Sequence, residues 1–412
     1  MGSRTMHEKD VLISGAGIAG PAMAHWLSRA GYRPTVVERA AAPRPGGQTV
    51  DVRGAARTVV ERMGLLDAVK AIRVEERGIA FVDTLGRRKA EMSADAFGGE
   101  GIVAEIEVLR GDLAELLHDA TRETTEYLFD DAITAIEQDD DGVTVRFRRA
   151  PQRRFALVIG ADGLHSGVRA LAFGPEERFV RPLGCITAYF TVPNRYSLDG
   201  WFEMYNAPGT MVALRPDRDP ATVKALLGMR TPPAGVDRRD QEAVRALLAK
   251  AFTGTGWVAD QVIADMQTST DVFWEELGQV EMDSWSAGRV VLLGDAAWCP
   301  SPISGLGTSA ALVGAYVLAG ELARAGGDHK AAFAAYETVL RPYVKEAQQL
   351  PPGGVNGFVP ASRLMIAMRV QTTRWMTRWP LRNVVAKEFT KAEAITLPDY
   401  TISATPVTRP AP

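Results

Sequence analysis

Three glycine-rich turns, each containing or preceding an acidic residue, are the parts of this chain whose residue types could do chemistry. In the first, an apolar run at 11–14 leads into glycines at positions 15, 17 and 20, and a second apolar run ends at Glu38. Gly15 permits a tight turn, Gly17 lets a pyrophosphate approach the backbone, and Gly20 lets the next helix pack closely. The amides at the start of that helix would face phosphate, and Glu38 would accept hydrogen bonds from ribose hydroxyls. The spacing predicts a dinucleotide site and leaves NAD and FAD both open.

A second acidic turn favours FAD. In "RRFALVIGADGLHSGVRALAF" a buried strand at 155–160 ends in a turn with Asp162, and a short helix with Ser166 and Arg169 follows. An Asp-Gly pair alone is a common turn. Its place directly after a continuous apolar strand indicates a ligand-binding turn. A second acidic turn of this kind is not needed to bind NAD, so the pattern favours FAD.

The third stretch, "GRVVLLGDAAWCPSPISGLGTS", places Asp295 just beyond the carboxyl end of a buried strand, where ligands of open α/β sheets bind. A helix is expected from Thr308 onward, with the turn 305–307 at its amino terminus. The carboxylate suits a polyol, and the positive end of the helix dipole suits an electron-rich ring edge. These are the requirements of ribitol and of the pyrimidine side of a flavin.

The motifs "GAGIAG", "GADGLHSGVR" and "GDAAWCPSPISGLG" resemble, in order and separation, the fingerprints of the single-component (class A) FAD-dependent aromatic monooxygenases of the hydroxybenzoate-hydroxylase fold. The likeness covers roughly residues 8 to 325. Length and the stretch "GGQTVDVRG" look most like the tetracycline-inactivating and polyketide-tailoring hydroxylases. The resemblance implies an α/β fold: a Rossmann-like FAD-binding domain (GR2-type) with an inserted antiparallel-sheet substrate domain and a C-terminal helix.

The resemblance also implies roles for individual residues. Glu38 would hold the adenosine ribose, Arg39 would lie along the adenine, and Arg110 would contact FAD. Asp295 would bind the ribityl chain, and Pro302 would pack beside the isoalloxazine. The expected cofactor-binding residues are Gly15, Gly17, Ala19, Gly20, Glu38, Arg39, Gly47, Asp51, Arg110, Asp162, Asp295, Pro302, Gly305, Leu306 and Gly307.

The third motif departs from the family pattern at four positions. Trp298 stands where histidine is usual, Leu306 where glutamine is common, Ser309 where asparagine is common, and Gly314 where aspartate often occurs. Backbone amides would contact the flavin at the turn, so Leu306 is compatible with flavin binding. An indole at position 298 would change what the flavin edge admits. The residues expected beside the flavin ring are Trp298, Pro302, Gly305 and Leu306, and no catalytic residue is assigned.

The order of the motifs predicts a discontinuous FAD-binding domain and a substrate domain whose alternating strands lie over the flavin. The FAD-binding domain comprises 1–75, 100–173 and 280–347, the substrate domain 76–99 and 174–279, a C-terminal bridging helix 355–395, and a tail 396–412. The helix could instead be a pocket lid or a membrane-contacting segment. Candidate substrate contacts, each with core packing as its alternative, are Tyr189, Trp201, Met204, Met211, Arg215, Met365 and Met368.

Composition excludes several classes of partner. The 412 residues carry a net charge of −3 with basic and acidic residues interspersed, which does not indicate nucleic acid or an acidic membrane. Two cysteines are too few for a disulfide framework, and five scattered histidines show no metal-ligand spacing. We expect a cytoplasmic monomer or homodimer with no metal and no stable membrane insertion.

The resemblance implies an NAD(P)H- and O₂-dependent hydroxylase that inserts one oxygen atom, through a flavin hydroperoxide, into an apolar aromatic or polyketide-like small molecule. A flavin halogenase is disfavoured because "WxWxIP" is absent. An FAD-dependent dehydrogenase or oxidase would use the same loops. A flavin-binding drug-sequestering protein without turnover also remains open.

Overall fold

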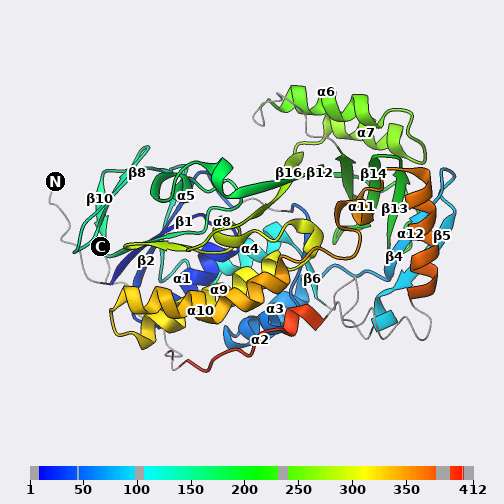
Figure 1. Ribbon diagram of the computed structural model, residues 1–412. Coiled ribbons are helices and arrows are strands. Elements are labelled where there is room, and N and C mark those ends of the chain that lie inside the picture. The colour runs from blue at the N-terminus through cyan, green and yellow to red at the C-terminus, as the bar shows by residue number, and fades with distance from the viewer. Residues whose placement is uncertain are drawn as a thin grey trace.

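The computed structural model describes residues 9–43, 46–97, 106–230, 240–376, 390–400 and 402. Two large sheets organise these residues (Figure 1). The smaller one has six strands, and the larger one has seven. Helices cover both sheets, and the three motif turns all leave strands of the six-stranded sheet.

The six-stranded sheet is parallel except at one edge, where β17 runs antiparallel to β18. The chain passes from β1 to β2 on one side and returns later to place β11 on the other side of β1. The carboxyl ends of β1 and β11 therefore flank the topological switch point, where ligands of such sheets bind. In spatial order the strands are β17 (Ser286–Ala287), β18 (Val290–Leu292), β11 (Leu157–Gly160), β1 (Asp10–Ser14), β2 (Arg33–Glu38) and β7 (Glu126–Phe129).

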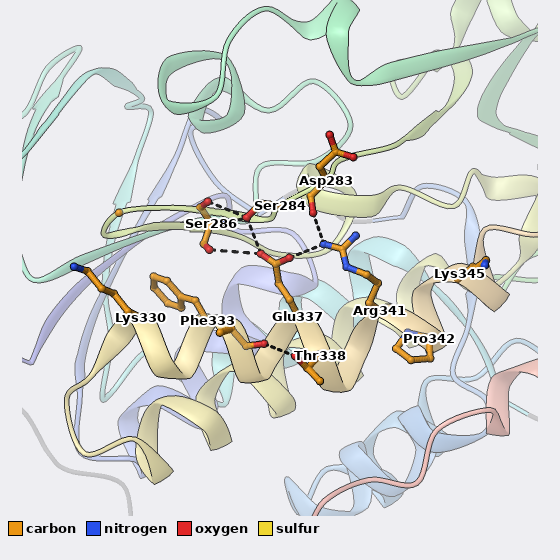
Figure 2. A pocket seen from close by; sticks show the side chains of 12 residues that line it. Asp283, Ser284, Ser286, Lys330, Phe333, Glu337, Thr338, Arg341, Pro342 and Lys345 are labelled. Atoms are coloured by element: carbon orange, nitrogen blue, oxygen red, sulfur yellow. Dashed lines mark hydrogen bonds and ion pairs between the residues drawn. The ribbon is translucent and has the colours of Figure 1, made fainter.

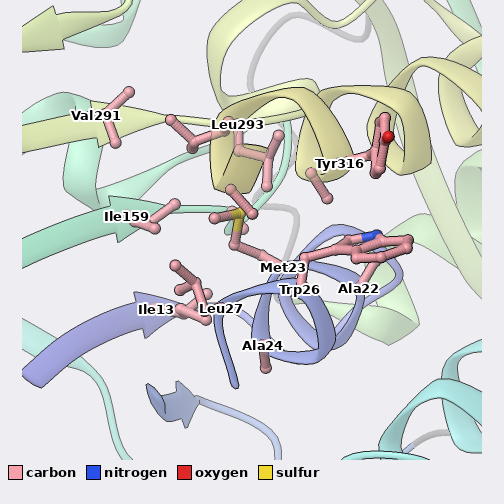
Figure 3. Close-up of a cluster of buried hydrophobic side chains, with 14 of the residues drawn as sticks. Ile13, Ala22, Met23, Ala24, Trp26, Leu27, Ile159, Val291, Leu293 and Tyr316 are labelled. Atoms are coloured by element: carbon pink, nitrogen blue, oxygen red, sulfur yellow. The ribbon is translucent and has the colours of Figure 1, made fainter. Parts of the chain in front are cut away.

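Helices α1 (Ala19–Arg29) and α9 (Gly307–Arg324) bury one face of this sheet. Figure 3 shows Ile13 and Ile159 of the sheet meeting Met23 of α1, with Trp26 next to Tyr316 of α9. The rings of Trp26 and Tyr316 meet edge to face, 5.0 Å apart. This packing fixes the start of both helices at the switch point.

The remaining elements of this half surround the same core. They are α2 (Ala55–Arg62), α3 (Leu66–Ala71), α4 (Arg110–Asp119), α5 (Gly167–Ala172), α8 (Asp295–Trp298), η3 (Pro302–Ser304) and α10 (His329–Ala347), with a sheet of β8 (Ile133–Gln138), β9 (Val143–Phe147) and β10 (Arg153–Phe155) and a pair β3 (Thr49–Asp51) and β6 (Glu107–Leu109). Side chains of Ser166 and Asp328 cap α5 and α10 by accepting backbone hydrogen bonds.

The seven-stranded sheet is antiparallel except for its parallel pair β13 and β4. In spatial order it contains β16 (Phe273–Val280), β12 (Val180–Pro193), β15 (Thr222–Arg230), β14 (Thr210–Pro216), β13 (Trp201–Ala207), β4 (Gly78–Val82) and β5 (Arg88–Ser93). Helices α6 (Gln241–Phe252) and α7 (Ala259–Thr268) cover one face (Figure 1). Short turns η1 (Ala94–Phe97) and η2 (Glu176–Arg178) flank the sheet.

The opposite face of this sheet, here called the inner face, packs against η3, α11 (Gly354–Phe358) and α12 (Arg363–Met376). The expected architecture of a Rossmann-like domain and an antiparallel substrate sheet is confirmed. The residue limits given for the two domains stay a prediction.

The prediction of a single helix at 355–395 is wrong. The described part is two helices, α11 and α12, separated by a break at Val359 to Ser362, and η4 (Thr390–Glu393) follows later. Pro360 lies in that break, where a proline opposes helix continuation. Residues 377–389 lie outside the described residues, as do 401 and 403–412 of the expected tail. Tyr400 is packed, and its hydroxyl donates to Glu321 Oε1 at 2.7 Å.

Candidate functional site

The three motif turns lie next to one another at the carboxyl ends of β1, β11 and β18 of the six-stranded sheet. Ser14 and Gly160 are register partners on β1 and β11, and Gly160 is the partner of Leu292 on β18. The amide of Ala161 donates to Ser14 O at 2.8 Å. A Cβ atom at Gly15 would lie 2.5 Å from Ala161 O, so only glycine lets the first and second turns approach this closely.

The first turn forms a glycine-rich cradle in front of α1. A Cβ atom at Gly20 would overlap Gly15 O, and one at Gly17 would lie 3.2 Å from Arg110 Nη2. No side chain caps the amino terminus of α1. Free helix amides with a guanidinium beside them are suited to a pyrophosphate.

Glu38 lies at the end of β2 beside this cradle. Its Oε2 accepts from the amide of Ala16 and its Oε1 from the amide of Ala40, both at 2.8 Å. The carboxylate is half-buried and within reach of a ligand on the first turn. Arg39, which follows it, is exposed.

Asp295 of the third turn and Arg110 of α4 are the charged residues near the start of α9. Asp295 Oδ1 lies 3.7 Å from the position that a Cβ at Gly307 would take, so it faces the start of α9. Burial raises the pKa of the Asp295 carboxyl, and the charge of Arg110 opposes that rise. The third turn and α4 therefore place opposite charges within electrostatic reach of each other.

The segment 46–53, which contains β3, lies beside Arg110 and the third turn. The amide of Gly111 donates to Gly46 O at 2.7 Å, and a Cβ at Gly47 would lie 3.9 Å from Arg110 Cβ. Asp51 pairs with Arg53 at 2.6 Å. Asp51 Oδ2 also lies 3.4 Å from a Cβ position at Gly305, which puts this ion pair beside the third turn.

Ser309 fixes this loop to α9, a role that the sequence did not reveal. Its hydroxyl accepts from the amide of Arg53 and donates to Asp51 O, both at 3.2 Å. Serine replaces the asparagine common in the family, so a short hydroxyl positions the loop here.

Asp162 supports the second turn from within. Its Oδ1 accepts from Ser166 Oγ at 2.5 Å and its Oδ2 from the amide of Val168 at 3.1 Å. Burial raises the pKa of Asp162, and these hydrogen bonds oppose that rise. Much of its hydrogen-bonding capacity is thus used by α5.

Pro302 and Gly305 are exposed at the edge of the third turn, and Gly305 has φ +68°. Leu306 points the other way: it is buried and packs with Ala347 and Ala392. The side chain of Leu306 thus points away from the exposed part of the turn. A ligand at the exposed part would contact backbone groups of the turn and not this side chain.

Trp298 does not lie at the cofactor edge, contrary to our expectation. Its ring is 1% exposed and packs against Trp285 and Tyr336, at centroid distances of 4.5 and 5.9 Å. A Cβ at Gly314 would lie 2.9 Å from the indole. The two departures are therefore coupled, because glycine in α9 makes room for a tryptophan that turns into the core.

The candidate substrate residues divide between two faces of the seven-stranded sheet. Met204 and Met211 pack on the inner face. Tyr189 lies on the same face, because its neighbours Ala188 and Phe190 on β12 pack on the opposite face, against α7. Trp201 lies on the opposite face, because Trp201 and Glu203 alternate with Met204 along β13. Arg88 contacts both residues of that face: its guanidinium lies 4.9 Å over the ring of Trp201, and its Nε donates to Glu203.

Arg215 is already paired within the protein. It forms buried ion pairs with Glu76 and Glu107. Burial alone would lower the pKa of Arg215, but the two carboxylates outweigh it and raise the pKa. A fixed triad of this kind joins the substrate sheet to β6 rather than presenting a free cation to a ligand.

Met365 and Met368 lie on α12, and the structure places them differently. Met365 is half-buried, whereas Met368 is 52% exposed on the side that also exposes Leu364 and Trp375. Arg369, one residue further, donates to Asn206 Oδ1 at 3.0 Å and lies 4.2 Å over the ring of Phe81. Arg369 is what attaches α12 to the inner face.

A surface groove lies apart from these residues, between α10 and the loop before β17 (Figure 2). Glu337 in this groove is partnered, because it accepts from Ser284 Oγ at 2.9 Å and from Arg341 at 2.5 Å. Arg341 also covers Trp285 at 4.5 Å. Arg341 therefore lies between the groove and the aromatic cluster that contains Trp285 and Trp298.

The residues present fit FAD. The first turn offers amides and Arg110 for a pyrophosphate, Glu38 a ribose acceptor, and Asp295 a polyol acceptor, all at one sheet edge. Within the described ranges, no three His, Cys, Asp or Glu side chains come together as a metal site requires. None of the helices described combines the length and apolar character needed to cross a membrane.

Comparison with known proteins agrees with this class of site, a Rossmann-like flavoprotein site beneath an antiparallel sheet. Residues 8–350 match the FAD binding domain family, and the chain belongs to that family. The resemblance to class A FAD-dependent monooxygenases is thereby confirmed.

Three similar proteins illustrate the family. Uncharacterized protein Rv1260 of Mycobacterium tuberculosis (strain ATCC 25618 / H37Rv) is 46% identical over 353 residues, 85% of this chain and 95% of that protein. A flavin-dependent monooxygenase of Legionella longbeachae serogroup 1 (strain NSW150) is 38% identical over 340 residues, 82% of this chain and 87% of its own. The crystal structure of the tetracycline destructase Tet(55) superposes with a TM-score of 0.80 at 36% identity, covering 96% of this chain and 100% of that one.

Proposed function

We propose that this chain is an FAD-dependent monooxygenase that uses NAD(P)H and O₂ to insert one oxygen atom into an apolar aromatic or polyketide-like small molecule. The observation that carries the proposal is the meeting of the Gly15 turn, Arg110 and Asp295 at one sheet edge, next to the inner face of a second sheet. The family and the names of its relatives support the class of reaction, and the tetracycline destructases support the class of substrate.

Bound FAD would supply electron transfer from NAD(P)H and activation of O₂. The protein's part is to bind and position. The first turn and Arg110 would hold the pyrophosphate, Glu38 the ribose, and Asp295 the ribityl hydroxyls, while the amides at the start of α9 would face the pyrimidine edge. No acid or base of the protein is required for oxygen transfer itself, so the apolar inner face serves chiefly to orient a ligand and exclude water.

Two site variants test the assignment of the cofactor residues. Asp295→Ala is expected to weaken FAD retention more than Asp162→Ala, because Asp162 is engaged with Ser166 and Val168. The measurement is the flavin-to-protein absorbance ratio after gel filtration. Full flavin occupancy in Asp295→Ala would contradict the ribityl role.

The reaction class is tested with the purified yellow protein, NADH or NADPH, and a panel of aromatic polyketides that includes tetracycline. We expect a ligand that stimulates NAD(P)H oxidation and is recovered heavier by one oxygen atom. Reduction of the flavin by the ligand itself, without NAD(P)H and with a dehydrogenated product, would indicate a dehydrogenase or oxidase instead. Binding without any NAD(P)H oxidation would indicate a sequestering protein.

A further inference from the structure

Glu275 is a carboxylic acid that none of the three motifs explains. It lies on β16 opposite Thr187 of β12. Its Oε1 is buried and has no hydrogen-bond partner within the described part of the chain, although the residue as a whole is only half-buried. A buried carboxyl oxygen without a partner costs free energy. A group that solvent still reaches in part can have that oxygen satisfied by a ligand.

The neighbours of Glu275 form a polar strip on the inner face. Thr187 Oγ1 is also buried, and it interacts with the hydroxyl of Tyr189. Tyr189 follows Thr187 on the same face of β12, and burial first, then the charge of Glu275, raises the pKa of its hydroxyl. The unsatisfied oxygen of Glu275 and the Thr187–Tyr189 pair of hydroxyls therefore lie on adjacent strands of one face.

The strip adjoins the candidate cofactor residues. Burial raises the pKa of Glu275 to about 7, the charge of Asp295 on α8 adds to the rise, and Arg110 on α4 opposes it. Tyr189 from β12 and Cys299 after α8 are the other titratable groups that interact with it. Glu275 on β16 thus faces the third turn, and among the described residues no lysine or arginine lies within ion-pair distance of it.

We propose that Glu275 and Thr187 bind a hydroxyl group on the aromatic or enol ring of the substrate, with Glu275 Oε1 accepting the hydroxyl proton. This rests on the proposed function and restricts its substrate class to rings that carry a phenol or enol. Transfer of the proton breaks the ring O–H bond and forms an O–H bond on the carboxyl of Glu275, while the ring oxygen keeps the electron pair.

The first test is binding without NAD(P)H, so that it stays separate from turnover. The FAD-loaded protein is titrated calorimetrically with two matched pairs, 1-naphthol with 1-methoxynaphthalene and 2-hydroxyanthraquinone with 2-methoxyanthraquinone. We expect wild type to prefer the hydroxyl member by about tenfold or more, because the ether cannot donate to Oε1. Glu275→Gln should abolish the preference and Thr187→Val should reduce it.

Glu276→Gln is the control, because Glu276 is the register partner of Ile186, which packs on the opposite face against α6 and α7. It should keep the preference of wild type. Equal affinity within each pair for wild type, no binding of any member, or a preference that survives in Glu275→Gln would overturn the proposal. Binding with the expected preference but no oxygenated product would instead overturn the monooxygenase assignment.

A second measurement needs no ligand. In protein with ¹³C-labelled glutamate carboxyls, one resonance should titrate near neutral pH and be missing from Glu275→Gln. If the same resonance persists in the variant, Glu275 is not the proton-holding group.

Discussion

The guanidinium of Arg169, in the second motif, donates from Nη1 to the carbonyl oxygen of Ala296, in the third motif, at 2.9 Å. Arg169 is fully buried, and its Nη2 also donates to Leu164 O at 2.6 Å. Ala296 follows Asp295 directly. One side chain thus holds two turns, far apart in sequence, in the arrangement that the candidate site requires.

Removal of this connection should loosen both turns. Arg169→Leu leaves two carbonyls without their donor, which should lower the free energy of unfolding by about 2–4 kcal/mol. Affinity for FAD should fall by about tenfold or more, since Asp295 is no longer held in place. Urea unfolding and flavin titration measure the two effects. Arg178→Leu, at an exposed arginine, serves as the control, and an equal loss there would refute the role of Arg169.

Trp298 and Gly314 should be thermodynamically coupled. Gly314→Ala alone places a methyl group 2.9 Å from the indole and should destabilise the fold by about 1–3 kcal/mol. In a Trp298→Ala background the same change should cost much less, because the space is free. A double-mutant cycle by urea unfolding measures the coupling. Additive effects would show that the indole does not occupy this place.

Two glycines of the first turn should respond differently to alanine. A Cβ at Gly20 overlaps backbone, so Gly20→Ala should destabilise the fold. A Cβ at Gly17 meets only the movable end of Arg110, so Gly17→Ala should keep near wild-type stability while FAD affinity falls. Thermal unfolding and flavin titration separate the two. An unchanged FAD affinity in Gly17→Ala would mean that the ligand does not approach there.

Much of this arrangement could be predicted from sequence because each motif is local. Glycine spacing after an apolar strand sets a strand, a turn and a helix, and three such units place Asp295 and the Gly15 turn at one edge. The direction of Trp298 could not be predicted, since it depends on Gly314 in the next helix and on Tyr336 from α10. The pairing of Glu275 with Thr187 depends on a register between strands distant in sequence, which no local pattern contains.

Stability should depend on pH through Glu275. Its folded pKa of about 7 lies above the ordinary value of 4.5, so the fold favours the neutral acid. This contribution is fully present below the lower value and is lost as pH rises through the higher one. Glu275→Gln cannot ionise, so it should gain about 3 kcal/mol over wild type near pH 8 and little near pH 4.

Urea unfolding of the FAD-loaded proteins at both pH values checks this. Glu276→Gln should show no such pH-dependent gain. A variant advantage that is equal at both pH values would mean that Glu275 does not change its charge over this range.

The most direct test of the central claim, that this site performs oxygenation, is turnover under ¹⁸O₂ with the wild-type protein, NAD(P)H and the polyketide panel. We expect a product that carries a single ¹⁸O atom, with its yield strongly reduced in Asp295→Ala. Consumption of NAD(P)H with hydrogen peroxide as the only oxygen product, or ¹⁸O absent from every modified ligand, would contradict it.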